Sequence, residues 1–382
     1  MDPKNPNTRE NYRQTQDDTI KKLSHNRVFA AEKNKSNKKH LIGKIIGLVA
    51  VFMVGIGLAY FGRIYFAAMT TARQAYHGSG KTSAAIAQNK PVSILILGVD
   101  QGIEGRHDRG NSDTMILVTM NPQKKQATMT SIPRDLLVDV LGDQGKYYMF
   151  RVNSAYQVGG SKAAQKTVSH LVNAPIDYYM EVNMQALESM VDALGGVDVN
   201  VPFSFTYNTK FKKGKMHLNG KQALDYSRMR KEDPKGDYGR QMRQRQIITQ
   251  IVHEGMSLNS VNNYRKILNV LAKYVKTNLT FNDMMTIAMN YRGCASNMQS
   301  GYIHGHDAWI GGASLQVAST KELQRVSDLI RSSLGLPKQK LKNEETRQNS
   351  LQKGLKWSDP TAFENYVIYS QHSDTIAWDG TN

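Results

Sequence analysis

Runs of apolar residues divide the chain into a polar N-terminal region, one long uncharged segment and a mixed globular part. The long segment, Ile45–Gly62, has no charged residue and is long enough to cross a bilayer as a helix. Three shorter runs, at 92–98, 114–120 and 126–132, have the length and composition of strands. The turn "NPQKK" between the last two is short, so these two strands should form a hairpin.

Helical periods follow these strands. The segment 161–172 begins at a candidate N-cap, Ser161, and the segment 184–196 has one apolar face and ends in glycines. A third helix should begin at the pair Ser319 and Glu322, which has the spacing of a capping box. Because strands and helices intermix, the sequence predicts an α/β domain with a central mixed sheet flanked by helices.

Positive charges gather before the long apolar segment and are sparse after it. The lysines that precede it are Lys33, Lys35, Lys38, Lys39 and Lys44. Only Arg63 and Arg73 follow before Lys81. The positive-inside rule therefore predicts a retained transmembrane helix, a cytoplasmic N-terminus and an extracellular remainder. A cleaved signal peptide is the alternative, but the segment starts too late and its apolar part is too long.

These patterns predict five regions along the chain. They are a disordered cytoplasmic tail (1–40), a transmembrane helix (41–69), a linker (70–90), an extracellular folded domain (91–337) and a polar, loosely ordered C-terminal tail (338–382).

Composition adds a strong positive charge. The chain has 382 residues, a formal net charge of +18 and a pI of about 9.7. That excess favours a polyanionic partner, which could be nucleic acid, an anionic membrane or an acidic polymer. Cys294 is the single cysteine, which excludes an intramolecular disulfide, and the ten histidines are scattered without metal-ligand spacing.

Charged residues flank the predicted strands at one edge of the sheet. Asp100 follows the first strand, Asp113 precedes the second, and Arg134 with Asp135 follows the third. If the three strands run up, down and up, these side chains meet at one rim. Two carboxylates would hold Mg²⁺ while leaving positions for waters and phosphate oxygens. Taken singly, each aspartate is also an ordinary turn residue.

The segment from 210 to 245 is rich in cations. It contains twelve of them against four acids, the cations being Lys210, Lys212, Lys213, Lys215, Lys221, Arg228, Arg230, Lys231, Lys235, Arg240, Arg243 and Arg245. Arginine dominates its second half, and the planar guanidinium grips two phosphate oxygens at once. The turn-rich stretch "KEDPKGDYG" should bring "RMR" and "RQMRQR" face to face. A merely solvated surface is the competing interpretation.

Several blocks in order resemble the LytR-CpsA-Psr family, closely over 92–252 and more loosely to about 336. The blocks are "ILILGVD", "GNSDTMILVTMNPQKKQATMTSIPRDLLV", "RVNSAYQVGG", "PIDYYMEVNMQALESMVDALGGVDVNVP" and "HLNGKQALDYSRMRKEDPKGDYGRQMRQRQ". The resemblance implies an α-β-α fold with an apolar pocket for a polyprenyl tail. It also implies a membrane-anchored envelope enzyme of Gram-positive bacteria. Such an enzyme moves an anionic glycopolymer, of teichoic acid or capsule type, from a polyprenyl-pyrophosphate carrier to the muramic acid 6-hydroxyl of peptidoglycan.

The resemblance also assigns roles to residues. It implies that Asp100 and Asp113 hold Mg²⁺, or Mn²⁺, against the pyrophosphate, and that Asp113 takes the proton of the attacking hydroxyl. The phosphate ligands that it implies are Arg134, Arg228, Arg230, Arg240 and Gln244, with Arg243 and Arg106 as weaker candidates. Many members have an arginine where Asn111 stands here, and Arg109 lies two residues earlier. Lys231, Lys235 and Arg245 are expected to be ordinary solvated charges.

Three rival functions remain open at this point. A DNA-binding regulator needs a cytoplasmic basic domain, which the predicted topology opposes, so nucleic acid is not an expected partner. A non-catalytic binder would use the basic face to hold teichoic acid or lipid headgroups. A hydrolase would use the same site to cleave the lipid pyrophosphate with water.

Overall fold

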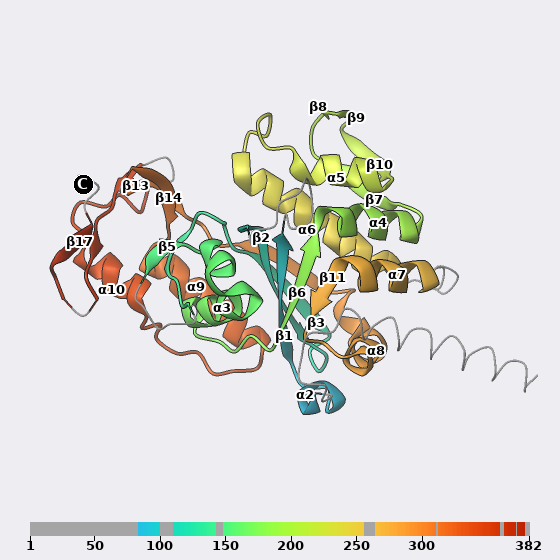
Figure 1. Cartoon of the computed structure of the whole chain (residues 1–382), viewed down its shortest axis with the longest axis horizontal. Coiled ribbons are helices and arrows are strands. Elements are labelled where there is room, and N and C mark those ends of the chain that lie inside the picture. Colours follow the sequence, from blue (N-terminus) through green and yellow to red (C-terminus); the bar gives the residue numbers. More distant parts are fainter. Residues whose placement is uncertain are drawn as a thin grey trace, which may run out of the picture. The chain divides into compact units, whose positions relative to one another are not determined.

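A six-stranded mixed sheet forms the centre of the computed structural model, which describes residues 83–99, 110–142, 148–255, 264–310, 312–359, 363–371 and 373–378 (Figure 1). In sheet order its strands are β11 (Val275–Thr277), β6 (Tyr178–Asn183), β1 (Val92–Val99), β2 (Ser112–Asn121), β3 (Gln126–Ser131) and β12 (Met298–Tyr302). β1, β2 and β3 pair antiparallel in succession, while β6 and β12 run parallel to β1 and β3. The predicted hairpin and the up-down-up order are both confirmed.

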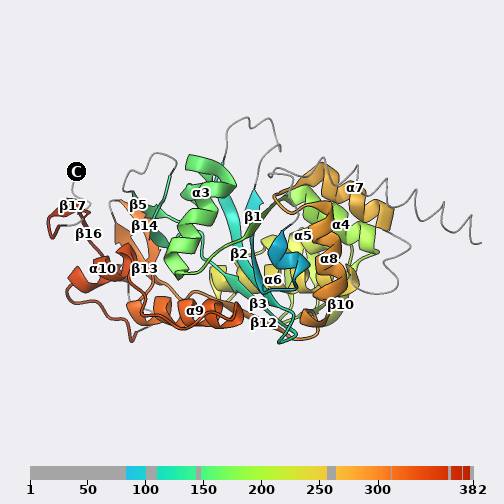
Figure 2. The same cartoon turned by 90° about the horizontal axis from the view of Figure 1, so that it is seen from below.

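Helices cover both faces of this sheet, as the sequence predicted (Figures 1 and 2). Leu95 and Leu97 pack with α3 (Ser154–Val172) and α9 (Thr320–Ser333) in the largest apolar cluster. Their neighbours Ile94 and Ile96 point to the opposite face, as successive strand residues do. The elements on that side are α2 (Ala84–Ala87), α4 (Met184–Leu194), α6 (Gly236–Gly255), α7 (Tyr264–Tyr274), α8 (Phe281–Asn290) and the 3₁₀ turn η2 (Arg292–Cys294).

A second apolar cluster builds the layer outside α4 and α6. It contains α5 (Gly220–Arg228), β7 (Val197–Val201), β8 (Phe205–Tyr207), β9 (Thr209–Phe211) and β10 (Gly214–Leu218). β7 alternates buried and exposed residues along its length, as a strand with one solvent-exposed face does. Asn219 caps α5 through a full capping box with Gln222, which fixes the start of the helix that ends at Arg228.

One helix start differs from the sequence prediction, and one predicted capping box is only half formed. α3 begins at Ser154, and a kink at Gly159 and Gly160 divides it; Ser161 follows the kink, but its hydroxyl donates to Glu181 rather than capping the helix. In α9, Ser319 Oγ accepts from the Glu322 amide at 3.2 Å, as predicted. The Glu322 carboxylate, however, accepts from the His304 amide. Residues distant in the sequence compete for these side chains, so local spacing does not determine which hydrogen bonds they form.

The C-terminal part is folded, which corrects the prediction of a loose tail after Lys338. Its elements are α10 (Glu344–Leu351), β15 (Glu364–Asn365), β16 (Ile368–Tyr369) and β17 (Ile376–Trp378). They pack with β4 (Leu137–Asp139), β5 (Met149–Arg151), β13 (His306–Ile310) and β14 (Ala313–Val317), and we call this group the C-terminal lobe. The segment is polar, but Gln348 is fully buried and exchanges two hydrogen bonds with the Tyr369 backbone. A polar residue satisfied in this way cannot be distinguished from a solvated one by sequence pattern.

The predicted linker is also partly ordered, because α2 packs its buried Ile86 near α8 and the Ser83 amide donates to Asp283. The apolar segment Ile45–Gly62 lies outside the described residues. No helix in the described part of the chain is long and apolar enough to cross a membrane.

Candidate functional site

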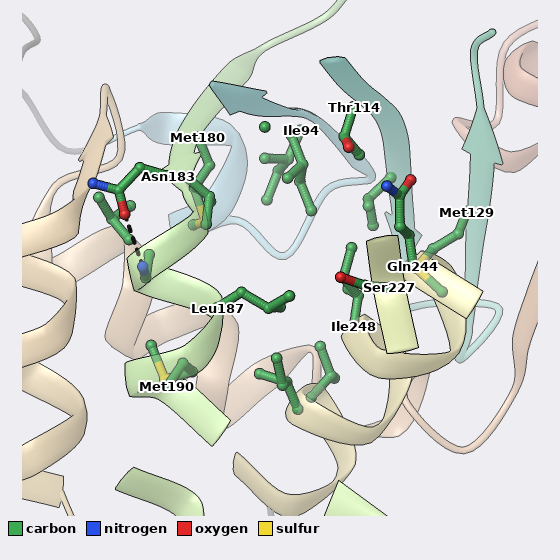
Figure 3. A pocket seen from close by; sticks show the side chains of 18 of the residues that line it. Ile94, Thr114, Met129, Met180, Asn183, Leu187, Met190, Ser227, Gln244 and Ile248 are labelled. Atoms are coloured by element: carbon green, nitrogen blue, oxygen red, sulfur yellow. Dashed lines mark hydrogen bonds between the residues drawn. The ribbon is translucent and has the colours of Figure 1, made fainter. Parts of the chain in front are cut away.

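A cavity of about 640 Å³ lies between the central sheet and the helices α4 and α6 (Figure 3). Its lining is mostly aliphatic and methionine side chains, including Ile94, Met129 and Met180 from the sheet. Leu187 on α4 projects into the cavity, and Ile248 on α6 borders it on another side (Figure 3). A cavity with such walls accepts a long apolar group.

Polar residues line the same cavity where three elements approach one another. They come from the start of β2, the end of α5 and the first half of α6, and they are Asp113, Thr114, Ser227, Arg228, Arg240 and Gln244. We call this group, together with Arg134, which donates to Asp113, the mouth. Gly98 of the block "ILILGVD" also belongs to the lining, and a Cβ there would lie 2.8 Å from Thr114 Cβ. Glycine therefore lets β1 and β2 approach closely at this end of the cavity.

Asp113 and Arg134 meet at the mouth, as the strand order predicted. Arg134 Nη1 donates to Asp113 Oδ1 at 2.8 Å, and Arg134 Nε lies 3.4 Å from Asp135 Oδ2. Burial lowers the pKa of Arg134, but the Asp113 hydrogen bond and the nearby carboxylates outweigh this and raise the pKa overall. Arg134 is thus firmly cationic at the edge of an apolar cavity.

Asp237 holds two further arginines together. Arg240 Nη2 lies 2.7 Å from Asp237 Oδ1, and Arg230 Nε lies 3.8 Å from the same oxygen. Gln241 donates to the other oxygen at 2.9 Å. Burial lowers the pKa of Arg240, and the positive charge of Arg134 contributes in the same direction. The predicted turn between "RMR" and "RQMRQR" therefore does bring the two runs together, around an aspartate that sequence analysis counted only as an opposing charge.

The arginines of the mouth fit an anion. Arg134 and Arg240 carry the guanidinium groups that suit phosphate oxygens. Arg240 Nε makes no hydrogen bond within the described residues, whereas Arg134 Nε lies beside Asp135 Oδ2. Asp113 Oδ1 is engaged by Arg134, which leaves the second oxygen for another partner. One or two carboxylate oxygens beside a phosphate suit Mg²⁺, which keeps several waters in proteins. No cluster of three or more His, Cys, Asp or Glu with the geometry of a metal site occurs among the described residues.

Comparison with known proteins identifies the family of this chain. The model of the LytR_cpsA_psr family matches residues 61–332. The chain belongs to this family. A relative in Enterococcus faecalis, the polyisoprenyl-teichoic acid–peptidoglycan teichoic acid transferase TagU, is 39% identical over 304 residues, which cover 78% of this chain and 99% of the relative.

Solved structures of family members share the fold. Bacillus subtilis TagU matches with a TM-score of 0.52 and 36% identity, covering 64% of this chain and 97% of that one. A structure of TagT bound to LIIa-WTA matches with a TM-score of 0.57 and 27% identity, covering 68% of this chain and 95% of that one. The Enterococcus faecalis relative is named as a transferase, and this family member has a cavity with an apolar interior and charged residues at its edge.

Two arginines of this family member differ from the roles predicted from the sequence, because both are buried. Arg243 is fully buried and donates to Asp233, to the Tyr226 carbonyl and to the Met229 carbonyl, so it is removed from the phosphate ligands. It ties the end of α5 to α6. Arg245, expected to be solvated, is 5% exposed and donates to Ser300 Oγ and to Ser131 Oγ.

The remaining predicted ligands divide by position. Arg228 and Gln244 line the cavity, whereas Arg230 reaches the mouth through its contact with Asp237. Asp100, Arg106 and Arg109 lie outside the described residues, so the paired carboxylates of the metal prediction are described only at Asp113. The contribution of Asp237 was missed because an aspartate in an arginine-rich segment gives no sign of which cation it will orient.

Proposed function

We propose that this protein is a membrane-anchored phosphotransferase of the cell envelope. It moves an anionic glycopolymer from a polyprenyl-pyrophosphate carrier to peptidoglycan. The observation that carries the proposal is the single cavity that combines an apolar interior with a mouth of arginines and Asp113. The interior fits the polyprenyl tail, and the mouth fits its pyrophosphate. The relatives named as teichoic acid transferases support the same reaction class.

The residues at the mouth have different roles in phosphoryl transfer. Arg134, Arg228 and Arg240 neutralise the pyrophosphate and hold it in place, with Gln244 as a neutral contact. The acceptor hydroxyl attacks the phosphorus that bears the polymer, and its proton passes to Asp113. The bond from that phosphorus to the bridging oxygen breaks, and polyprenyl phosphate leaves. When bound, Mg²⁺ would be held by Asp113 and Asp100 and would supply further neutralisation of the phosphate charge.

The location follows from topology and substrate. We place the anchor at Ile45–Gly62, the N-terminus in the cytoplasm and the domain beyond it outside the cell. Support comes from the uncharged segment and its flanking lysines. A polyprenyl carrier is itself a membrane lipid, so an anchored domain meets it at the bilayer surface.

A transfer assay tests the proposal. The full chain in detergent is mixed with lipid-linked teichoic acid, peptidoglycan oligomers and Mg²⁺, and covalent polymer–peptidoglycan product is measured. We expect product from the wild type and a loss of about 100-fold or more from Arg240→Gln, the scale seen when one donor to a developing charge is removed. Lys231→Gln, an exposed cation nearby, should keep full activity.

Each outcome discriminates between functions. Absence of covalent product from the wild type would refute the transferase. Release of polyprenyl phosphate with free polymer would instead identify a hydrolase at the same site. Retention of product formation by both Asp113→Asn and Arg240→Gln would show that the mouth only binds the polyanion.

A further inference from the structure

The outer face of the small sheet in the C-terminal lobe has an unusual combination of side chains. This sheet has the order β14–β13–β15, and its inner face is buried against Leu137, Tyr366 and their neighbours. The residues that point outward are Asp307, Trp309, Ser314, Gln316 and Asn365. We call these five the outer face.

Register places the polar residues around the tryptophan. Trp309 pairs with Ser314 on one neighbouring strand and with Asn365 on the other. Asp307 pairs with Gln316 in the next outward row, and Gln316 Nε2 donates to Asp307 Oδ1 at 3.1 Å. The indole is 54% exposed, so a large apolar ring stands in the open between a hydroxyl and an amide. Outward residues at a sheet surface are usually polar, and an aromatic one framed by hydrogen-bonding groups is a feature of recognition surfaces.

The outer face adjoins the chain segment that follows Arg134. The backbone N–H of Gln316 donates to the backbone carbonyl of Asp135 at 2.9 Å, and Leu136 forms a β-bridge with Gln316. Arg151 links the two regions again, since it donates to the Ser314 carbonyl at 3.1 Å and lies 3.4 Å from Asp135. Ser314 is two residues from Gln316, which is roughly 7 Å along a strand. Trp309 is on β13, the strand next to β14, so the indole lies two strand spacings, about 10 Å, across the sheet from the segment that carries Arg134.

The chemistry of the outer face selects an uncharged ligand. Its five residues include one carboxylate and no lysine or arginine, in a chain with 50 of these cations. A sugar chain presents apolar ring faces and many hydroxyl and amide groups, which match an indole framed by hydroxyl, amide and carboxylate side chains.

We propose that the outer face binds the glycan strand of the acceptor, stacking one sugar ring on Trp309 and directing a hydroxyl of a sugar farther along the strand to the mouth. This inference rests on the proposed function for the identity of the acceptor. It adds a binding surface for the second substrate, which the cavity and the arginines do not provide.

Calorimetry on the full chain tests the surface directly. The probe is a peptide-free peptidoglycan tetrasaccharide, and the proteins are the wild type, Trp309→Ala, Trp309→Phe and the control Ile376→Ala, which removes another exposed apolar side chain of the lobe. We expect Trp309→Ala to weaken binding about tenfold and Trp309→Phe to restore much of it, because a stacking ring remains. Ile376→Ala should bind as the wild type does.

Kinetics separate this role from the chemistry of the mouth. In the transfer assay Trp309→Ala should raise KM for the glycan acceptor about tenfold, while kcat and KM for the lipid-linked donor stay within twofold. Unchanged tetrasaccharide affinity and acceptor KM in Trp309→Ala would overturn the inference while leaving the transferase intact. Tetrasaccharide binding that needs Trp309 in a protein with no transfer activity would instead keep the surface and remove the proposed function.

Two other occupants would also overturn the inference. If Trp309→Ala converts a dimer to monomers in sedimentation, a second copy of the chain covers the outer face. If it weakens binding of lipid-free teichoic acid but not of the tetrasaccharide, the ligand is the polymer rather than the acceptor.

Discussion

Glu345 offers a quantitative test of how the C-terminal lobe is held. Its side chain, on α10, is buried, and Oε1 accepts from the Asp139 amide at 2.9 Å. Its Oε2 is buried and makes no hydrogen bond within the described residues. Burial raises the pKa of Glu345 from 4.5 to about 7, and the nearby Asp139 carboxyl has a pKa that burial also raises.

The magnitude follows from this difference in pKa. Unfolded, Glu345 ionises near 4.5, and folded it ionises near 7, so the folded chain binds more protons between these values. The contribution of Glu345 to the free energy of unfolding therefore falls as pH rises from 4.5 to 7 and is constant above that range. At about 1.36 kcal/mol per pH unit, the loss amounts to roughly 3 kcal/mol. Glu345→Gln removes the ionisation and keeps an oxygen for the Asp139 amide.

Denaturant unfolding between pH 4 and 8, followed by circular dichroism, measures the effect. We expect Glu345→Gln to gain stability relative to the wild type as pH rises, by up to about 3 kcal/mol above pH 7. Asp374→Asn, which changes an exposed carboxylate of the same lobe, should track the wild type at every pH. A difference between wild type and Glu345→Gln that does not vary with pH would refute the reasoning.

Three further predictions concern the cavity, its framework and the metal. Leu187→Trp should fill the cavity and weaken binding of the lipid-linked donor at least tenfold, while the affinity for inorganic pyrophosphate stays unchanged. The control Gln185→Trp, on the exposed side of α4, should leave both affinities unchanged. If Leu187→Trp weakened both ligands equally, an apolar role for the cavity would be contradicted. Arg243→Gln should lower the free energy of unfolding by about 3–5 kcal/mol in urea titrations, because Asp233 remains buried without its partner, and a loss below about 1 kcal/mol would show that the pair is not structural. Chelation with EDTA should abolish transfer without releasing the bound donor, and Mg²⁺ or Mn²⁺ should restore it; full turnover in the chelator would exclude the metal.

The early part of the fold was predictable because its signals are local. The apolar runs at 92–98, 114–120 and 126–132 could bury their side chains only as central strands, and the turn "NPQKK" left a hairpin as the simple connection between the last two. The antiparallel order then placed Asp113 and Arg134 at one edge, where the structure joins them by a 2.8 Å hydrogen bond. The cluster of arginines was likewise visible in sequence as a charge excess around a turn.

Within that cluster, only packing decided which arginines face the cavity. Arg240, Arg243 and Arg245 lie within six residues on one helix, yet Arg240 lines the cavity while the other two are buried among neutral and acidic partners. Sequence spacing separates the faces of a helix, but it does not say what each face meets. Asp237 shows the same limit, since its role depends on Arg230 and Arg240 arriving on both sides of it.

The sequence by itself determined the α/β class, the central hairpin and the chemical nature of the site, because apolar periodicity and charge density are properties of the chain alone. Tertiary structure alone decided that the polar segment after Lys338 folds, that Gln348 and Glu345 are buried, and that Trp309 is not. The physical reason is that a polar side chain is stable inside when its hydrogen bonds are satisfied, and its partners lie far away in the chain. The outer face around Trp309 arises in the same way, from strands brought together only by folding.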